Sequence, residues 1–431
     1  MIDLLILAAL VIGYGLVSGW LAGTSVTAPM IFVTAGFVLG EGGLGWLTGT
    51  ADEGAVRILA ETTLVLVLFT NAVRIRIVTL RREYQFPARL LGVGMPLGVV
   101  FGTAAALLLF DDFGVWEAAL LAAVLVPTDA ALGAAVVSDR RLPVRVRQTL
   151  NVESGLNDGI ALPIVLLMVA LTASSEGLEG SAWYWVGFAV RRIGLGAVAG
   201  VLVGVIGGWL LSRLDAARAV TSTYRRLIVV ALAVASFVTA ELVTGNGFIS
   251  AFVAGLSFGT VAREQCPQVH DFAEREGELL AMLTFTMFGA VIAGPFLGDI
   301  DWRIVVYAVL SLVAVRMLAV ALSMIGSGVR GETVLFFGWF GPRGLASILF
   351  ALLVVEKVGT AQAEKIMLVA GVTVLLSAYA HGLTAAPWAR GFARRAGTMR
   401  PDAAERMPMT EHHVGYPHTE RPGTGNFRSH P

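Results

Sequence analysis

The chain consists largely of apolar runs, each long enough to cross a lipid bilayer as a helix. A spanning helix needs about 20 mostly apolar residues. Thirteen runs of this kind follow one another, at residues 2–22, 25–45, 56–73, 88–110, 115–138, 149–173, 190–212, 226–244, 247–262, 278–297, 302–326, 332–355 and 364–386. The third and ninth are short or interrupted, so twelve or fourteen are alternatives. We therefore predict an all-α polytopic membrane protein with about 13 transmembrane helices.

The composition supports this class. Hydrophobic residues make up 56% and charged residues 14% of the chain, whereas a soluble chain carries about 25% charged residues. The formal net charge is zero, which suggests no nucleic-acid partner. Cys266 is the only cysteine, so a disulfide framework or a cysteine metal site is excluded and no cofactor is expected. Residues 2–21 lack a basic leading region and are interpreted as a first span, not a signal peptide.

The placement of arginine predicts the orientation in the cell membrane, because cytoplasmic loops are rich in basic residues. With thirteen spans, four basic segments fall on one side, with Arg74, Arg76, Arg81 and Arg82; Arg140, Arg141, Arg145 and Arg147; Arg213, Arg218, Arg225 and Arg226; and Arg390, Arg394 and Arg395. The other side receives Asp52, Glu53, Asp111, Asp112, Glu176, Glu179, Asp299 and Asp301. The N-terminus is therefore expected outside and the C-terminus in the cytoplasm. Lys357 and Lys365, in an outer loop, are exceptions that the four basic segments outweigh.

The chain divides into a transmembrane domain, residues 1–390, and a tail, residues 391–431. The tail is rich in Pro, Gly, Arg, Glu and His and lacks apolar periodicity, which is typical of disordered segments. It contains His412, His413, His418 and His430. A solvated cytoplasmic tail is a plainer interpretation of these histidines than metal sensing.

Two interrupted spans occupy corresponding positions in two sets of six helices. Spans 1–6 and 8–13 are separated by one span, so they would form inverted repeats, as in many secondary transporters. The fifth span contains Pro127 followed by Thr128 and Asp129, and the twelfth contains the sequence GPRG at residues 341–344. A proline removes a backbone donor and breaks a helix. We predict two unwound helices whose carbonyls and dipole ends can hold ions.

The first candidate ion ligand is Asp129, beside the break in the fifth span. Ionisable residues at membrane depth mark ion or proton paths by default. Asp129 is therefore expected to bind a cation, with Thr128 supplying a hydroxyl or carbonyl oxygen. Alternatively, Asp129 caps a half-helix. Both roles can hold at once.

The second candidate is Asp158, two to three turns from the cytoplasmic end of the sixth span. Ser154 lies four residues earlier on the same helix face, and Asn157 directly precedes Asp158. These hard oxygen ligands suit an alkali cation. Burial favours a protonated carboxyl group and a bound cation favours the ionised form. Proton and cation would therefore compete for Asp158, one for one, unless the residue is a structural hydrogen-bonded aspartate.

Other charged residues at depth need partners. We expect Glu153 to pair with Arg316, and Arg343 to complement the broken-helix region, because an unpaired charge in a membrane is costly. Weaker candidates either line a funnel or lie at helix interfaces; they are Glu61, Asn71, Glu241 and Asn246.

Five motifs, in order on these spans, resemble the monovalent cation:proton antiporter-1 family, the bacterial sodium/proton antiporters related to animal sodium/proton exchangers. They are Pro127-Thr128-Asp129, ESGLNDG at 153–159, GNGFI at 245–249 with AFVAG at 251–255, Arg316, and GPRG at 341–344. The resemblance covers residues 1 to about 390. It implies a homodimer of thirteen-helix protomers, with a dimerisation domain and a core domain that moves like an elevator. The core would contain two crossing, unwound helices.

The resemblance also implies roles for single residues. Asp158 matches the ion-carrying aspartate, and Asp129, Thr128 and Ser154 match ligands of the Na⁺ site. Glu153 and Arg316 match a stabilising ion pair, and Asn157 in place of a second aspartate resembles the electroneutral branch. Two positions depart from the pattern. Residues 68–71 (LFTN) lack an acid that many relatives carry, and residue 130 is Ala where a proline often stands.

The expected function is a secondary antiporter that exchanges Na⁺, with Li⁺ or K⁺ as alternatives, for H⁺ and contributes to pH and sodium homeostasis. Its expected partners are these ions, membrane lipid and a second copy of the chain. A cation channel or a passive ion or pH sensor on the same fold is the alternative. An intramembrane enzyme fits poorly, because the sequence has no activated serine–base pair and no HExxH motif.

Overall fold

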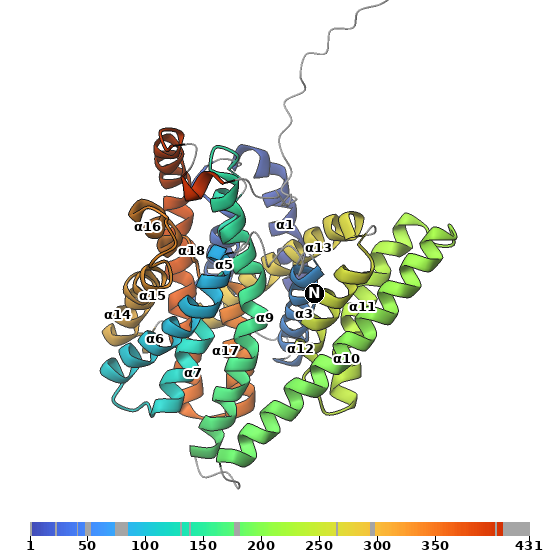
Figure 1. Cartoon of the computed structure of the whole chain (residues 1–431). Coiled ribbons are helices and arrows are strands. Elements are labelled where there is room, and N and C mark those ends of the chain that lie inside the picture. Colours follow the sequence, from blue (N-terminus) through green and yellow to red (C-terminus); the bar gives the residue numbers. More distant parts are fainter. Residues whose placement is uncertain are drawn as a thin grey trace, which may run out of the picture.

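The computed structural model describes residues 2–21, 24–40, 42–47, 53–73, 85–129, 132–137, 139–175, 182–263, 266–293, 298–400 and 403–407. These residues form helices joined by loops, and no strand occurs among them (Figure 1). The α-helices are α1 (Ile2–Leu21), α2 (Ala28–Leu39), α3 (Glu53–Val73), α5 (Gln85–Arg89), α6 (Met95–Leu109), α7 (Val115–Leu125), α8 (Ala134–Val137), α9 (Val144–Ser175), α10 (Ala182–Ala216), α11 (Ser222–Leu242), α12 (Gly247–Val261), α13 (Cys266–Met287), α14 (Trp302–Leu310), α15 (Arg316–Ser323), α16 (Gly331–Trp339), α17 (Leu345–Val358) and α18 (Ala361–Gly397). Short π-helical segments are η1 (Leu90–Gly94), η2 (Phe288–Ala293) and η4 (Ser311–Val315), and η5 (Ala404–Arg406) is a 3₁₀ turn.

The all-α fold is confirmed, and every predicted apolar run overlaps at least one of these helices. Five helical stretches are long and apolar enough to cross a membrane: 85–109, 144–172, 183–216, 302–323 and 361–397. Six shorter apolar helices accompany them within the described residues. The exact number of spans stays a prediction.

Small residues let the helix backbones approach closely. A methyl group added to Gly200 of α10 would lie 2.5 Å from the Ser250 carbonyl oxygen of α12, and one added to Gly204 would lie 2.3 Å from that of Ala254. Close backbone approach of this kind is the usual way in which membrane helices associate. The glycines of the seventh predicted span therefore pack α10 against α12.

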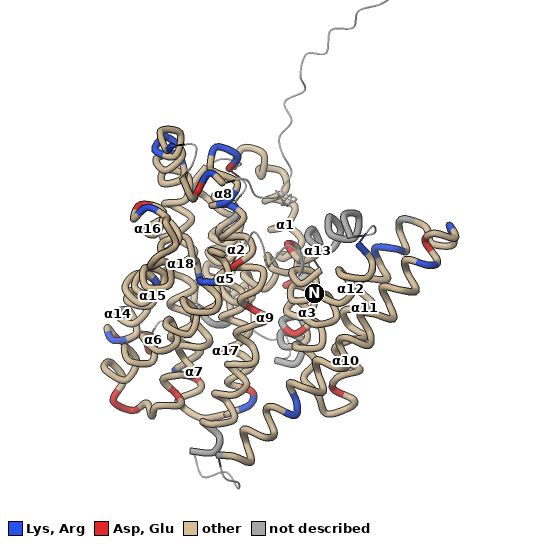
Figure 2. The backbone as a smooth tube through the Cα atoms, viewed as in Figure 1, with Lys and Arg blue, Asp and Glu red and all other residues tan. Residues whose placement is uncertain are grey.

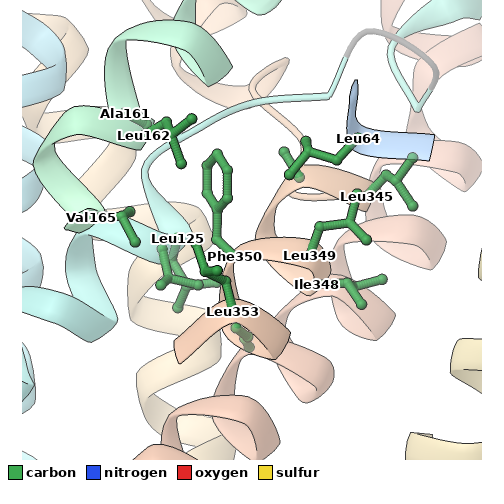
Figure 3. Packing of buried hydrophobic residues seen from close by; sticks show 14 of the residues in the cluster. Leu64, Leu125, Ala161, Leu162, Val165, Leu345, Ile348, Leu349, Phe350 and Leu353 are labelled. Carbon is green, nitrogen blue, oxygen red and sulfur yellow. The ribbon is translucent and has the colours of Figure 1, made fainter. Parts of the chain in front are cut away.

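The helices form two groups that meet at α9. In Figure 1, α10, α11 and α12 lie together on one side, α14, α15 and α16 lie on the other, and α9 stands between them. Helix α9 packs against α7 and α17 towards one group and against α3, α10 and α12 towards the other. Figure 3 shows Phe350 of α17 among Leu125 of α7 and Ala161, Leu162 and Val165 of α9. This apolar cluster fixes the helix that carries Asp158.

Both predicted helix breaks are present, and they touch each other. Helix α7 ends at Leu125 and residues 126–129 are not helical, while α16 ends at Trp339 and α17 begins only at Leu345. The backbone amide of Asp129 donates to the carbonyl oxygen of Pro342 at 2.8 Å. The two unwound segments therefore form one site, although the chain separates them by more than 200 residues.

The charged residues are unevenly distributed along the helix bundle. In Figure 2, basic residues gather where α9 begins, where α10 turns into α11 and where α18 ends. At the opposite end, the exceptional lysines have acidic partners: Lys365 contacts Asp112 at 2.7 Å and Lys357 contacts Glu356 at 2.8 Å. Pairing explains why these two cations do not disturb the overall asymmetry. Arg74 to Arg82 and Glu176 to Glu179 lie outside the described residues.

The first part of the segment expected to be a disordered tail is folded. Helix α18 continues to Gly397, and Phe392, Ala396 and Met399 are buried. Phe392 stacks on Phe336 of α16 at 4.4 Å between ring centroids. The structure differs here from the expectation because apolar side chains spaced by three and four residues give this stretch a helical face to bury. The four tail histidines and Ala130 lie outside the described residues.

Candidate functional site

Asp158 lies deep in the bundle, on α9, which passes beside the two helix breaks. It follows the first residue of the helix, Val144, by 14 positions, which is about four helical turns. The sequence placed it only two to three turns deep. The difference arises because α9 begins at Val144, before the apolar run itself. Asp158 is 6% exposed.

A set of hydrogen bonds ties α9 to the first break. The amide Nδ2 of Asn157 donates to Thr128 Oγ1 at 2.6 Å and to the Thr128 carbonyl oxygen at 3.1 Å. The hydroxyl groups of Thr128 and Ser154 lie 3.0 Å apart. The structure thus brings together Thr128, Ser154 and Asn157, and places Asp158 next to Asn157 in the same helix.

Two oxygen atoms at this point are buried without a donor. Asp158 Oδ1 and Asn157 Oδ1 are inaccessible to solvent and have no hydrogen-bond partner among the described residues. Buried polar atoms are normally paired, and an exception calls for an explanation such as a bound ion. A bound cation would satisfy these oxygens, whereas a proton on Asp158 would remove only the negative charge of its carboxylate; hard oxygens suit an alkali cation.

Asp129 caps α17, the helix that follows the second break. Its Oδ2 accepts from the backbone amide of Leu345, the first residue of α17, at 2.8 Å. A negative charge at a helix N-terminus is favourable, since the free amides there carry partial positive charge. Gly344 makes this approach possible, because a Cβ at that position would lie 2.0 Å from Asp129 Oδ2. The capping role is therefore present, and the ligand role stays a proposal.

Arg343 lies in the second break, and its side chain contacts the backbone of the first break. Its Nη1 donates to the carbonyl oxygen of Val126 at 2.8 Å and lies 3.4 Å from those of Pro127 and Gly341. It is 2% exposed. A cation at the C-terminal end of α7 balances the carbonyls that the break leaves without amide partners. Arg343 thus complements the broken region, as predicted.

Glu153 and Arg316 form the predicted ion pair in the buried core. Arg316 Nη1 donates to Glu153 Oε1 at 2.6 Å and Nη2 donates to Oε2 at 2.9 Å. Both residues are under 7% exposed. Arg316 Nη2 also lies 3.3 Å from the carbonyl oxygen of Phe337 near the end of α16. This two-pronged geometry is the strong form of the Arg–carboxylate contact, and it joins α9, α15 and α16.

The weaker candidates have structural contacts. Glu241 accepts from Arg192 at 3.0 Å and from the amide of Gly247 at 2.9 Å. Asn246 caps α12 by accepting from the amide of Ile249 at 3.0 Å. These two residues shape the α11–α12 turn. Glu61 and Asn71 lie partly buried on α3, and a role for them stays a prediction.

Two serines near the breaks are not among the residues predicted from the sequence. Ser377 of α18 accepts from the backbone amide of Arg343 at 2.7 Å and so holds the second break. Ser347, in the first turn of α17, is fully buried, and its hydroxyl has no partner in the described part of the chain. Both are polar groups at membrane depth, which is a signal. It is a weak one, because a helical serine usually bonds its own backbone.

Comparison with known proteins identifies the family of the chain. The family model described as "Sodium/hydrogen exchanger, transmembrane" matches residues 6–391. The chain belongs to this family. Its members are transporters, so the expectation that the chain is not an enzyme is confirmed. The multi-pass membrane architecture is confirmed in the same way.

The chain is similar to several named proteins. The K⁺/H⁺ antiporter NhaP of Alkalimonas amylolytica is 27% identical over 338 residues, 77% of this chain and 57% of that protein. The K⁺/H⁺ antiporter NhaP2 of Shewanella oneidensis is 26% identical over 75% of this chain and 55% of its own length. The chain thus spans somewhat over half of these relatives. The sodium proton antiporter MjNhaP1 of Methanocaldococcus jannaschii has the same fold, with a TM-score of 0.74 at 19% identity over 92% of this chain and 98% of that one.

Proposed function

We propose that the chain is an antiporter in which a monovalent cation and a proton compete for Asp158. The buried, unpartnered oxygens of Asp158 and Asn157, beside the Thr128–Ser154 pair, carry this proposal. Family membership and the printed names of the relatives support it. In the proposed site, Asp158, Asp129, Thr128 and Ser154 supply the cation ligands, and Glu153, Arg316 and Arg343 keep the two breaks in place.

The proposed exchange is one for one. A cation that enters displaces the proton from the Asp158 carboxyl group, and a returning proton releases the cation, so the loaded site carries the same net charge in both states. Asn157 adds no second titrating group. Exchange in proteoliposomes should therefore not respond to an imposed membrane potential. A rate that rises steadily with potential would contradict the one-for-one stoichiometry.

Na⁺ is the proposed cation, with Li⁺ as an alternative. K⁺ is the second candidate, because two relatives are named K⁺/H⁺ antiporters. Selectivity depends on cavity size and on the number of ligands. Half-saturating concentrations for Na⁺, K⁺ and Li⁺, measured by dequenching of a pH-sensitive dye across a pH series, decide between them. A saturable flux also separates an antiporter from a channel, which would give a large conductive current.

An elevator-type movement would slide one helix group past the other. Thr34 of α2, a helix that packs against α13, is hydrogen-bonded to Tyr379 of α18, a helix that packs against α14 and α17. We propose that this contact opens in the cycle. Replacing both by cysteine in a Cys266→Ser background, and bridging them with a short bifunctional thiol reagent, should stop exchange, and a cleavable reagent should let it resume. Wild-type transport by the bridged protein would overturn the movement.

We propose that the protein lies in the cell membrane as a homodimer. Its N-terminus would be outside, and the end of the helix bundle that is rich in arginine, with the C-terminus, would face the cytoplasm. The charge asymmetry of Figure 2 supports this orientation. Labelling of single cysteines at the α10–α11 turn and the α6–α7 loop, in intact cells and in inverted vesicles, tests it. Light scattering of the detergent-solubilised protein gives the number of copies.

A further inference from the structure

Residues 403–407, which follow α18 in the chain, lie against the N-terminal ends of two helices of the candidate site. We call residues Ala403–Met407, which include η5, the clip. Within it, Glu405 is 1% exposed. A carboxylate is rarely so buried at the end of a chain segment unless it has specific partners.

The first partner of the clip is the N-terminus of α16. Glu405 Oε1 accepts from the backbone amide of Arg330, the residue that caps α16, at 2.8 Å. It also accepts from the hydroxyl of Thr333, in the first turn, at 2.8 Å. Glu405 therefore supplies to α16 the cap that its own sequence lacks, and its charge suits the positive end of the helix.

The second partner is the N-terminus of α9. Arg145, in the first turn of α9, donates from Nη1 to the carbonyl oxygen of Ala404 at 2.7 Å. Its guanidinium group also lies over the Phe86 ring of α5, 4.1 Å from the centroid. The same five-residue clip is therefore bound to the helix of Asp158 and to the helix that precedes the second break.

Helix α16 connects the clip to the buried ion pair. Its nine residues make it about 13 Å long. Glu405 binds its first turn, while near its other end the Phe337 carbonyl oxygen contacts Arg316, the partner of Glu153. Two charged residues, Glu405 and Arg316, thus contact the two ends of one short helix.

One carboxylate oxygen of the docked clip lacks a hydrogen-bond partner in the described part of the chain. Glu405 Oε2 is buried and has no hydrogen-bond partner among the described residues. A cavity of about 360 Å³ lies beside the clip; its lining includes Arg141, Pro143, Ala396, Glu405 and Met407. A buried carboxylate oxygen without a donor carries an unrecovered desolvation penalty. This lowers the stability of the docked state relative to a released one.

We propose that the clip is a releasable positioning element for the transport site. Docked, it fixes α16 relative to α9 and so keeps the crossing ready to bind a cation. Released, it lets α16 shift and weakens cation binding. The transport part of this inference rests on the proposed antiport, whereas docking of the clip does not.

The experiment uses the full-length protein and two readouts. Docking is followed by the rate of limited trypsin cleavage after Arg406, since a bond is cut faster when its segment is released. Cation binding is followed by the half-saturating cation concentration for exchange in proteoliposomes. The variants are Glu405→Ala, Thr333→Val, which removes one partner from the α16 side, and the double variant. Glu332→Ala is the matched control, because Glu332 lies exposed in the first turn of α16 and pairs with Arg395 at 3.3 Å.

Glu405→Ala and Thr333→Val should each speed the cleavage and raise the half-saturating concentration by about three- to tenfold, within the usual range of such couplings. The double variant should be no worse than the more severe single one, because both act on one contact. Glu405→Gln, which keeps an acceptor oxygen, should restore most of the affinity, and Glu332→Ala should change neither readout. Unchanged cation affinity with faster cleavage, or unchanged cleavage in both single variants, would overturn the proposal. If the wild-type protein shows no exchange while the cleavage pattern is as expected, the proposed antiport fails and the docking stands.

Discussion

Asp129, at the break in one span, accepts a hydrogen bond at 2.8 Å from the backbone amide of Leu345, the first helical residue after the break in another span. The amide of Asp129 in turn donates to Pro342. The same short stretch therefore gives and receives a hydrogen bond across the crossing. Because each break satisfies backbone groups that the other exposes, neither can change shape alone.

The first prediction concerns the closeness of this contact. Gly344→Ala would place a Cβ only 2.0 Å from Asp129 Oδ2, which is too close for both atoms to stay in place. The carboxylate has to leave the N-terminus of α17, so we expect exchange in proteoliposomes to fall by at least about tenfold, as losses of a positioned group commonly do. Gly331→Ala is the control, since a Cβ there would meet nothing within 4 Å. Full activity of Gly344→Ala would show that the Asp129 cap is dispensable.

The second prediction concerns the ion carrier. Asp158→Asn keeps the size of the side chain but cannot exchange a proton for a cation. Cation-induced proton release should disappear, while the yield of folded protein is retained. Asp299→Asn, at an exposed acid, should exchange normally. Undiminished proton release from Asp158→Asn would remove Asp158 from the mechanism.

The third prediction concerns the buried ion pair. Glu153→Gln leaves the Arg316 guanidinium buried without a counter-charge. Breaking a buried pair by removing one partner costs about 3–5 kcal/mol, and we expect a clearly lower thermal stability in detergent. Replacing both residues, with Glu153→Leu and Arg316→Met, should recover most of that stability without recovering transport. A double variant less stable than Glu153→Gln would contradict this account.

The fourth prediction concerns pH and the loop before α9. Burial raises the pKa of Asp139, but its hydrogen bonds with Arg141 outweigh this and hold the pKa below the ordinary value. A depressed pKa means that the contact stabilises the fold above the unfolded-state pKa of about 3.9 and is lost as the pH falls through the folded value. Asp139→Asn should therefore be less stable than wild type at pH 7, and the difference should shrink in acid. A difference independent of pH would point to another cause.

The fifth prediction concerns close helix packing. A Cβ on Gly255 of α12 would lie 2.2 Å from the Phe69 carbonyl oxygen of α3. Since the backbone cannot move aside as a side chain can, Gly255→Ala should lower the free energy of unfolding by about 1–3 kcal/mol, the usual range for overpacking. The change is measured as a lower melting temperature in detergent. Gly155→Ala on α9, where a Cβ would meet nothing within 4 Å, should be neutral. Equal stability of the two variants would show that α3 and α12 can separate without loss.

Much of the fold could be predicted because a bilayer leaves few alternatives to the helix. The two breaks are predictable because Pro127, and Pro342 with its flanking glycines, are unfavourable in a helix interior. The signal is not absolute, since Pro163 and Pro387 lie inside α9 and α18 without ending them. The cost of an unpaired charge predicts a buried arginine beside Glu153, and the family resemblance matches Glu153 with Arg316. These inferences need only local sequence and the environment, not the path of the chain.

Other parts of the site depend on distances that the sequence does not contain. Nothing in a run of residues indicates that Asp129 reaches the amide of Leu345, or that Ser377 reaches Arg343. The described residues 391–400 and 403–407 differ from the expected disordered tail for a similar reason. Their composition is that of a tail, and only the presence of Phe336 and the N-terminus of α16 gives Phe392 and Glu405 something to bind.

The Glu153–Arg316 pair also has a consequence for how the protein is made. The two residues are 163 positions apart in the chain, and synthesis proceeds at about 5–20 residues per second. For roughly 8–30 s, therefore, the helix that contains Glu153 exists without its arginine. During that interval the carboxyl group has to be protonated or in contact with water. The first six spans therefore cannot fold completely by themselves. The buried ion pair forms only after Arg316 has left the ribosome.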